Sequence, residues 1–392
     1  MKKLKCTGPD YFATRAGGLL LILSLCTLIL CGGGVLVLAD GPYPAACPAG
    51  LICGKLAPRG PSMVYDCASA RPPAGTRGVG NIYLMHGDDG MYAKAMWAET
   101  MLQLAGEGFT SLACDARGFS PGASPNDPTA YHYDLLAQDI LDLTTFEGFN
   151  STFGGKFHIV AHDQGARVAW HSIAKGMTRD LLLSFSSLSI PHADVFSDNV
   201  CCDAATVYKE DQVAEQYLRQ LTLNNSVRVN HNAIFSEFCK ELGFDTPESC
   251  QPSFWWYNGA IDSGAMAMAP LMPFGDSIAS KVNIDYDMVK ALTPYPLDGV
   301  PQTVKVGPVQ KFPVYFACGS ADTCDLCSFR VVNQTKAMVQ SAFSSTINSC
   351  GHKLVSVDKC GKAERQKVID GIVANVKAGN SQNRTGNLGD MS

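Results

Sequence analysis

The sequence lacks the patterns by which proteins usually bind nucleic acids, nucleotides and structural metals. Its 31 Lys and Arg residues against 36 Asp and Glu residues give a net charge of −5, and they form no basic run, which argues against a nucleic-acid partner. We find no glycine-rich phosphate loop, no dinucleotide-binding fingerprint and no Cys/His spacing typical of zinc. Cys324 and Cys327 form an isolated C-x-x-C pair, which is weak evidence for redox or metal chemistry.

Charge is also absent from a stretch near the N-terminus. Residues 16–39 carry no charged side chain and follow four basic residues, which predicts a secretory signal peptide or a signal anchor. The stretch is long enough to span a bilayer, and Val37-Leu38-Ala39 would serve as a cleavage site. Because the basic flank lies on the N-terminal side, either fate places the body in the secretory lumen or outside. We expect a secreted or type II membrane-anchored protein, with any membrane association made through residues 16–39.

Cysteines and glycosylation sequons fit that compartment. The chain has 16 cysteines, and oxidising compartments allow them to form disulfides. Thirteen lie beyond Ala39, an odd number, so at least one is free or paired with another chain. Connectivity cannot be read from sequence. The cysteines expected to form disulfides are Cys47, Cys53 and Cys67 near the N-terminus, and Cys201, Cys202, Cys239 and Cys250 further on; the sequons are at Asn150, Asn224, Asn333 and Asn383.

The body divides into three parts by composition. Residues 40–60 are rich in proline, glycine and cysteine and predict an irregular lead-in. Strand-like and helix-like segments alternate over 61–190 and again over 306–380, which predicts an α/β core: a mostly parallel sheet with helices on both faces. Residues 191–305 lose the alternation and predict an inserted helical cap. The periodicity of 363–377 predicts a closing helix, followed by a flexible tail over 381–392.

The most informative segment is Val160-Ala161-His162-Asp163-Gln164-Gly165-Ala166-Arg167. An apolar run from Phe157 precedes it and a helical pattern follows it, so Asp163 falls on a sharp strand-to-helix turn of the kind that exposes a nucleophile. The helix N-terminus favours an anion there, and an ionised carboxylate can attack a carbon to form an ester. Serine at this point would suggest acyl transfer; aspartate suggests displacement at an alkyl carbon. The alternative use of Asp163 is as a helix N-cap.

Two later segments supply candidate partners for that aspartate. The strand-like run Phe312–Cys318 is followed by Asp322, and a weaker strand at Thr346–Cys350 is followed by His352. The order nucleophile, acid, histidine is the order of hydrolases with this turn. Both residues follow strand C-termini, where an open α/β sheet places its chemistry. We therefore predict that Asp163, Asp322 and His352 form one site.

Four segments resemble the epoxide hydrolase branch of the α/β-hydrolase superfamily. They are the strand and turn Asn81-Ile82-Tyr83-Leu84-Met85-His86-Gly87, the loop Asp115-Ala116-Arg117-Gly118-Phe119-Ser120-Pro121-Gly122, the turn at Asp163, and Ser189-Ile190-Pro191-His192. Together with the acid and histidine turns, the resemblance covers roughly residues 60–378. It implies the α/β-hydrolase fold with an inserted helical cap. It also implies an oxyanion hole made by the backbone N–H groups of Asp88 and Gln164, with His86 beside the substrate pocket.

The resemblance also implies two tyrosines that protonate the epoxide oxygen. Tyr217 follows an acidic and glutamine-rich stretch, and Tyr257 ends the aromatic run Phe254-Trp255-Trp256-Tyr257. A phenol, with an unperturbed pKa of about 10, stays protonated at neutral pH and can donate to the departing oxygen. Trp255 and Trp256 are expected beside an apolar pocket. The alternative for the aromatic run is core packing.

The chain departs from the family at two places. Asp88-Asp89-Gly90 stands where an apolar or aromatic residue and a proline are usual, and the extra carboxylates could raise the pKa of Asp163. Gln164 replaces the usual tryptophan, whose N–H holds a leaving halide in haloalkane dehalogenases. Fluoroacetate dehalogenases place arginines one and four residues after the aspartate, and here only Arg167 fits.

The sequence thus predicts an enzyme that converts a small apolar epoxide and water into a diol. Asp163 attacks the less hindered carbon, and His352, oriented by Asp322, activates the water that cleaves the resulting ester. This chemistry requires no metal and no organic cofactor. Two alternatives remain open: a haloalkane or haloacid dehalogenase with the same aspartate, and a non-catalytic protein that binds ligands in the cap cleft.

Overall fold

The computed structural model describes most of the predicted core and little of the predicted cap. The described residues are 47–87, 93–145, 155–200, 244, 249–250, 252–253, 255–256, 305–309, 311–322, 327–357 and 359–389. The N-terminal segment 1–39, Asp88, Tyr217 and Tyr257 lie outside them, as do most residues of 191–305. Within the described part of the chain, no helix is long and apolar enough to cross a membrane.

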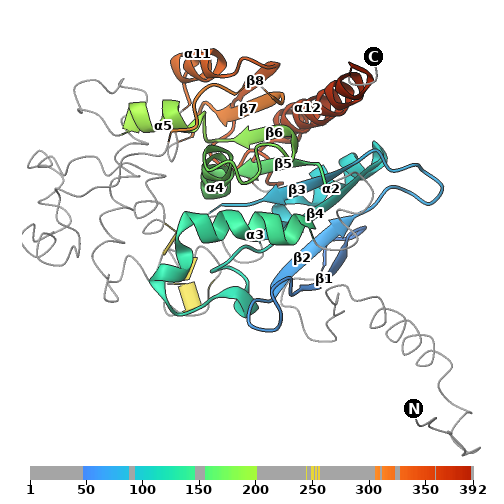
Figure 1. Cartoon of the computed structure of the whole chain (residues 1–392), viewed down its shortest axis with the longest axis vertical. Helices are drawn as coiled ribbons and strands as arrows, with labels where there is room; N and C mark the ends of the chain where they lie inside the picture. The colour runs from blue at the N-terminus through green and yellow to red at the C-terminus, as the bar shows by residue number, and fades with distance from the viewer. Residues whose placement is uncertain are drawn as a thin grey trace, which may run out of the picture.

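An eight-stranded sheet forms the centre of the molecule, with strand order β1-β2-β4-β3-β5-β6-β7-β8 (Figure 1). Strand β2 runs antiparallel to both β1 and β4, and all other neighbours are parallel. Strands β3, β5, β6 and β7 are buried along their whole length, as expected for a parallel sheet covered on both faces. The bounds are β1 (Ile52–Leu56), β2 (Tyr65–Ala70), β3 (Gly80–Met85), β4 (Phe109–Cys114), β5 (Phe157–His162), β6 (Leu182–Leu188), β7 (Val314–Gly319) and β8 (Phe343–Asn348).

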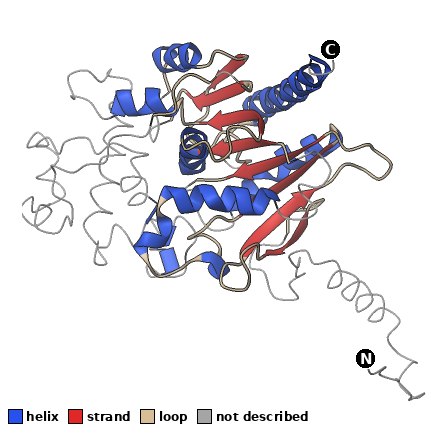
Figure 2. Ribbon diagram, in the orientation of Figure 1, coloured by secondary structure: helices blue, strands red, loops and turns tan. Residues whose placement is uncertain are grey.

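Helices cover both faces of this sheet, which confirms the predicted fold class (Figure 2). One apolar core lies under α3, α4 and α11, through residues such as Leu136, Val168 and Val331. A second core lies under α2 and α12, through residues such as Leu104 and Ile369. The helices are α2 (Ala98–Gly106), α3 (Tyr133–Thr145), α4 (Asp163–Ala174), α5 (Ala193–Val200), α11 (Phe329–Met338) and α12 (Lys362–Gly389), with short 3-10 turns η1 (Ala93–Trp97), η2 (Pro121–Ala123) and η3 (Pro128–Tyr131).

Element bounds differ from the sequence prediction mainly at the C-terminal end. Strand β8 begins at Phe343, three residues before the predicted start at Thr346, because it is an edge strand with partly exposed residues and so lacks a continuous apolar run. Helix α12 continues past Lys377 to Gly389, so the segment expected to be a flexible tail from residue 381 is helical up to that point. No proline interrupts it there, and helix propagation adds one hydrogen bond per residue.

Disulfides fasten the ends of several strands. Cys67 on β2 bonds to Cys114 on β4, and Cys47 bonds to Cys53 beside β1. Cys318–Cys327 and Cys350–Cys360 lie at the ends of β7 and β8. Cys250 is also disulfide-bonded, whereas Cys201, Cys202 and Cys239 lie outside the described residues. Since Cys327 pairs with Cys318, it does not form a redox pair with Cys324.

The start of α4 packs closely against the end of β3. A Cβ atom at Gly165 would overlap the backbone carbonyl of His86, and backbone cannot move aside as a flexible side chain can. We predict that Gly165→Ala lowers the free energy of unfolding by roughly 1–3 kcal/mol, the usual cost of overpacking. Chemical denaturation would measure it.

Gly106→Ala is the matched control, because a Cβ at Gly106 would meet no atom within 4 Å. It should leave the stability unchanged or raise it by up to about 1 kcal/mol, since alanine favours helix over glycine. Equal denaturation midpoints for the two alanine variants would contradict the close packing of α4 on β3.

Candidate active site

Asp163 lies on the turn between β5 and α4 in a strained backbone conformation. Its φ is 49°, one of two positive values among the non-glycine residues that the structure describes. The helix N-cap is His162, which makes no side-chain capping bond. One carboxylate oxygen of Asp163, Oδ1, instead accepts a hydrogen bond from the N–H of Gln164. Strain of this kind is typical of a turn that presents a functional side chain, and it disfavours the N-cap alternative.

The loop after β3 lies directly against this carboxylate. A Cβ atom at Gly87 would overlap Oδ1 of Asp163 and lie 2.6 Å from the backbone nitrogen of Gln164. Only glycine therefore allows the backbone to approach the nucleophile so closely. Asp88, the residue predicted to donate a second backbone N–H, follows immediately in the chain but lies outside the described residues.

The structure brings the three predicted residues together. The Nε2 atom of His352 lies 3.0 Å from Oδ2 of Asp163, and its Nδ1 atom lies 3.1 Å from Oδ2 of Asp322. The side chain of Asp322 is fully buried and that of His352 is 14% exposed. The three residues come from the C-terminal ends of β5, β7 and β8 and form one chain of hydrogen bonds.

His162 and Ser189, two residues that the sequence analysis did not single out, hold His352 through its backbone. Its backbone carbonyl accepts hydrogen bonds from Nε2 of His162 at 2.9 Å and from the hydroxyl of Ser189 at 3.1 Å. Ser189 follows β6 with a φ of 67°, the second strained non-glycine residue among those described. In the sequence, the role of these two residues was indicated only by their positions, His162 at the end of β5 and Ser189 directly after β6. A hydrogen bond to a backbone carbonyl leaves no pattern in the sequence.

Gln164 is buried and contacts a further residue that was not predicted. Its side-chain oxygen accepts a hydrogen bond of 2.6 Å from the hydroxyl of Tyr133, which lies at the start of α3. Both side chains are almost completely buried. The amide nitrogen of Gln164 has no hydrogen-bond partner among the residues that the structure describes.

The other predicted pocket residues brace the loop after β4. Both ring nitrogens of His86 bond backbone atoms, Nε2 accepting from the N–H of Ala116 at 2.8 Å and Nδ1 lying 2.6 Å from the carbonyl of Gly87. The indole N–H of Trp256 donates to the carbonyl of Arg117 at 2.6 Å, and Trp255 packs on Tyr131. These contacts give His86, Trp255 and Trp256 a structural role, and their predicted position beside the substrate stays a prediction.

Buried ion pairs hold the same loop. The guanidinium of Arg117 donates to both carboxylate oxygens of Asp139, at 2.6 and 2.9 Å. Asp115 pairs with the buried ammonium of Lys94. A buried charge is stable only when it is paired and hydrogen-bonded, so these pairs fix the loop on which Trp256 and His86 rest.

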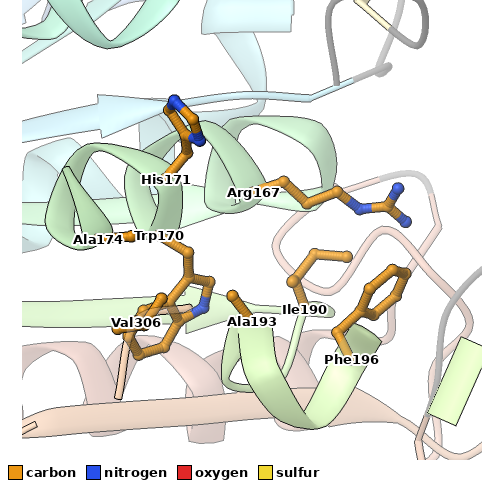
Figure 3. Close-up of a pocket in the computed structure, with 8 residues that line it drawn as sticks. All are labelled: Arg167, Trp170, His171, Ala174, Ile190, Ala193, Phe196 and Val306. Carbon is orange, nitrogen blue, oxygen red and sulfur yellow. The ribbon is translucent and has the colours of Figure 1, made fainter. Parts of the chain in front are cut away.

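Arg167 lines a pocket whose lining includes neither Asp163 nor Asp322 nor His352. This pocket is lined by Arg167, Trp170, His171, Ala174, Ile190, Ala193, Phe196 and Val306 (Figure 3). The guanidinium carbon of Arg167 lies 4.2 Å from the centre of the Phe196 ring, a cation–π distance. Arg167 thus acts on Asp163 through its charge, which lowers the pKa of that carboxyl together with other groups.

The charges of the site set its protonation state. Burial raises the pKa of Asp163, but the hydrogen bond and the charge of His352 lower it further, so it lies well below its ordinary value. Burial lowers the pKa of His352, whereas the charges of Asp322 and Asp163 and their hydrogen bonds raise it well above its ordinary value. At neutral pH the resting site therefore holds an imidazolium between two carboxylates.

Two disulfides enclose the loops that carry the acid and the histidine. Cys318 and Cys327 flank Asp322 within a sequence separation of 9, and Cys350 and Cys360 flank His352 within a separation of 10. Rings of this size remove about 2–3 kcal/mol of chain entropy from the unfolded state in the loop-closure account. The same rings restrict the motion of the loops that carry Asp322 and His352.

Comparison with known proteins identifies the fold's relatives. Residues 82–359 match the alpha/beta hydrolase family. The chain belongs to this family. As a member of the alpha/beta hydrolase family, it has a sequence similar to that of epoxide hydrolase 3 from Xenopus tropicalis, with 28% identity over 116 residues. That similarity covers 30% of this chain and 29% of the relative, so the chain spans less than a third of the length of the curated relative it matches.

Solved structures of alpha/beta hydrolases resemble the whole core. An epoxide hydrolase from metagenomes of hot environments has a TM-score of 0.53 at 15% identity, covering 82% of this chain and 98% of that one. A variant of the Bacillus megaterium epoxide hydrolase with bound product has a TM-score of 0.51 at 14% identity, covering 80% and 97%. At these identities the likeness shows the fold. Among the described residues, no cluster of His, Cys, Asp and Glu could hold a metal ion.

The electrostatic coupling between Asp163 and His352 is directly testable. Asp163→Asn removes a negative charge beside the imidazolium, which then loses stabilisation relative to the neutral ring. We predict that the pKa of His352 falls in this variant, as measured by NMR titration of the imidazole.

Asp180→Asn is the matched control, because it removes a surface carboxylate that pairs with Lys311. It should leave the pKa of His352 unchanged. A pKa that is the same in wild type and Asp163→Asn would contradict the hydrogen-bonded pair described above.

Proposed function

We propose that this protein is an epoxide hydrolase that opens an epoxide to a vicinal diol through an aspartyl ester. The observation that carries the proposal is the position of Asp163 on a strained turn, with its carboxylate 3.0 Å from the imidazole of His352, which in turn bonds Asp322. A carboxylate cannot catalyse acyl transfer as a serine does, but it can displace oxygen from a strained alkyl carbon. The epoxide hydrolases among its relatives and structural neighbours support the same assignment.

In the first step the Asp163 carboxylate attacks the less hindered epoxide carbon. The new C–O bond to Oδ2 forms while the ring C–O bond breaks, and the departing oxygen takes a proton. Tyr217 and Tyr257, both outside the described residues, are proposed to donate that proton. Oδ1, which accepts from the N–H of Gln164, becomes the carbonyl oxygen of the ester.

In the second step His352 acts as a base on water. Ester formation removes the negative charge of Asp163, so one of the causes that raise the pKa of His352 disappears. The imidazolium then passes its proton to the tyrosinate that the first step leaves, and neutral His352 takes a proton from the attacking water. The water oxygen adds to the ester carbonyl, and the N–H of Gln164, together with that of Asp88, is proposed to stabilise the oxyanion. When this intermediate collapses, the ester C–O bond breaks and the diol oxygen takes the proton of the added hydroxyl group, so Asp163 returns as a carboxylate, His352 as an imidazolium and the tyrosines as neutral phenols.

We also propose that the protein functions in the secretory pathway or outside the cell. The four disulfides whose two cysteines both lie in the described part of the chain are compatible with an oxidising compartment. The predicted signal segment lies outside that part.

The two-step scheme predicts a trapped intermediate. His352→Gln removes the base of the second step and leaves the nucleophile of the first, so the ester should accumulate. Intact-protein mass spectrometry should show an increase equal to the mass of the whole epoxide, mapping to Asp163 after digestion. The Asp163→Asn/His352→Gln double variant should show no adduct. A folded His352→Gln variant that binds the epoxide but gains no mass would rule out the ester.

The cap tyrosines separate epoxide opening from dehalogenation. An alkoxide needs a proton donor to leave, whereas a halide leaves as a stable anion. We predict that Tyr217→Phe and Tyr257→Phe each lower epoxide turnover on the order of a hundredfold, and that any haloalkane turnover changes far less. Tyr315→Phe is the control, since that ring packs against Gly371 of α12, in the core on the sheet face that α2 and α12 cover. Near wild-type epoxide turnover in both tyrosine variants would assign these residues to packing.

A further inference from the structure

The side-chain amide of Gln164, the residue after Asp163, forms a hydrogen bond through its oxygen but not through its nitrogen within the described part of the chain. Its oxygen accepts a hydrogen bond from the Tyr133 hydroxyl at 2.6 Å, and its nitrogen is buried without a partner in the described part of the chain. Gln164 is 1% exposed and directly follows the nucleophile. Buried polar groups in native proteins are almost always hydrogen-bonded, so an amide N–H₂ group without a partner among the described residues needs an explanation.

Tyr133 determines which end of the amide remains free. Its side chain is fully buried, and burial raises the pKa of the hydroxyl far above its ordinary value. The hydroxyl therefore stays protonated and donates to Oε1 of Gln164. With the oxygen held in this way, the two N–H bonds of Gln164 are the groups left for a ligand.

The charge of the free group defines the ligand it suits. An amide N–H₂ is a neutral donor, so it matches a neutral acceptor such as an ether, hydroxyl or carbonyl oxygen. A carboxylate would call for a cation, and the guanidinium of Arg167 lies over the ring of Phe196 instead. The resting site already holds two carboxylates, which disfavours a further anion.

Resting on the epoxide hydrolase assignment, we propose that the side-chain amide of Gln164 binds a neutral oxygen of the substrate close to the epoxide ring. The preferred substrates are then oxygen-bearing epoxides, such as glycidyl ethers, rather than purely hydrocarbon epoxides. Gln164 is a specificity-determining residue, and Tyr133 is a positioning residue that acts through it. The role differs from that of the Gln164 backbone, whose N–H bonds the nucleophile.

Two epoxides of the same shape test the proposal. Phenyl glycidyl ether and 1,2-epoxy-4-phenylbutane differ only in an oxygen that replaces a methylene group. The measured quantity is the ratio of kcat/KM for the ether to kcat/KM for the hydrocarbon. We expect wild type to favour the ether. In Gln164→Met, which keeps the length and volume without the donor, the ratio should fall roughly five- to tenfold, the net effect of one neutral hydrogen bond.

Tyr133→Phe separates positioning from packing. Without the hydroxyl the amide is free to rotate, so the ratio should fall, though less than in Gln164→Met. The Gln164→Met/Tyr133→Phe double variant should have the same ratio as Gln164→Met alone, because Tyr133 acts only through the amide. A fall in the double variant equal to the sum of both single effects would assign Tyr133 to packing and overturn its role.

Product binding keeps the test independent of turnover. Calorimetry gives the corresponding ratio of association constants, that of 3-phenoxypropane-1,2-diol to that of 4-phenylbutane-1,2-diol, and this ratio should fall between wild type and Gln164→Met. If both epoxides are hydrolysed but neither ratio changes, the inference fails and the enzyme assignment stands. If neither is hydrolysed but the diol ratio falls, the recognition stands and the enzyme assignment fails. An effect of Gln164→Met confined to bromoalkane turnover would make the amide a halide site and overturn the inference.

Discussion

The shared imidazole of His352 is the interaction on which the site depends. Two buried carboxylates, Asp163 and Asp322, face it from opposite sides at 3.0 and 3.1 Å. A buried charge is costly unless it is paired and hydrogen-bonded, and His352 hydrogen-bonds to both carboxylates. The same contact therefore lowers the pKa of Asp163 and ties together the ends of three strands that are distant in sequence.

This arrangement constrains the surrounding loops more than the helices. The carbonyl of His352 is held by His162 and Ser189, so the histidine is fixed through its backbone as well as its ring. The loop after β4 is fixed separately by the Arg117–Asp139 pair. Strain at Asp163 and Ser189 persists because these contacts over-determine both turns.

Much of the site could be predicted from the sequence because Asp163, Asp322 and His352 each follow the end of a strand. The apolar run before Asp163 and the helical pattern after it defined the turn, and the order of Asp322 and His352 matched it. The contacts of Ser189 and Tyr133 were not predicted, since a bond to a carbonyl or to a neighbouring amide leaves no spacing to detect. Trp255 and Trp256 were predicted to lie beside the substrate, and their described contacts are with Tyr131 and Arg117. The sequence could not predict these contacts, because the same aromatic pattern occurs in substrate pockets and in packed cores.

The disulfide rings around Asp322 and His352 make the assembly of the site a matter of oxidation as well as folding. Apart from the Cys67–Cys114 bond between β2 and β4, the strands are held by backbone ladders and apolar packing, which do not depend on thiol chemistry. The loops of Asp322 and His352 are closed by disulfides that begin at Cys318, within β7, and at Cys350, two residues after β8. In a reduced chain the backbone ladders and apolar packing would remain, while the loops of Asp322 and His352 would lose their covalent closure. Helical content measured by circular dichroism would therefore not distinguish the reduced chain from the oxidised one.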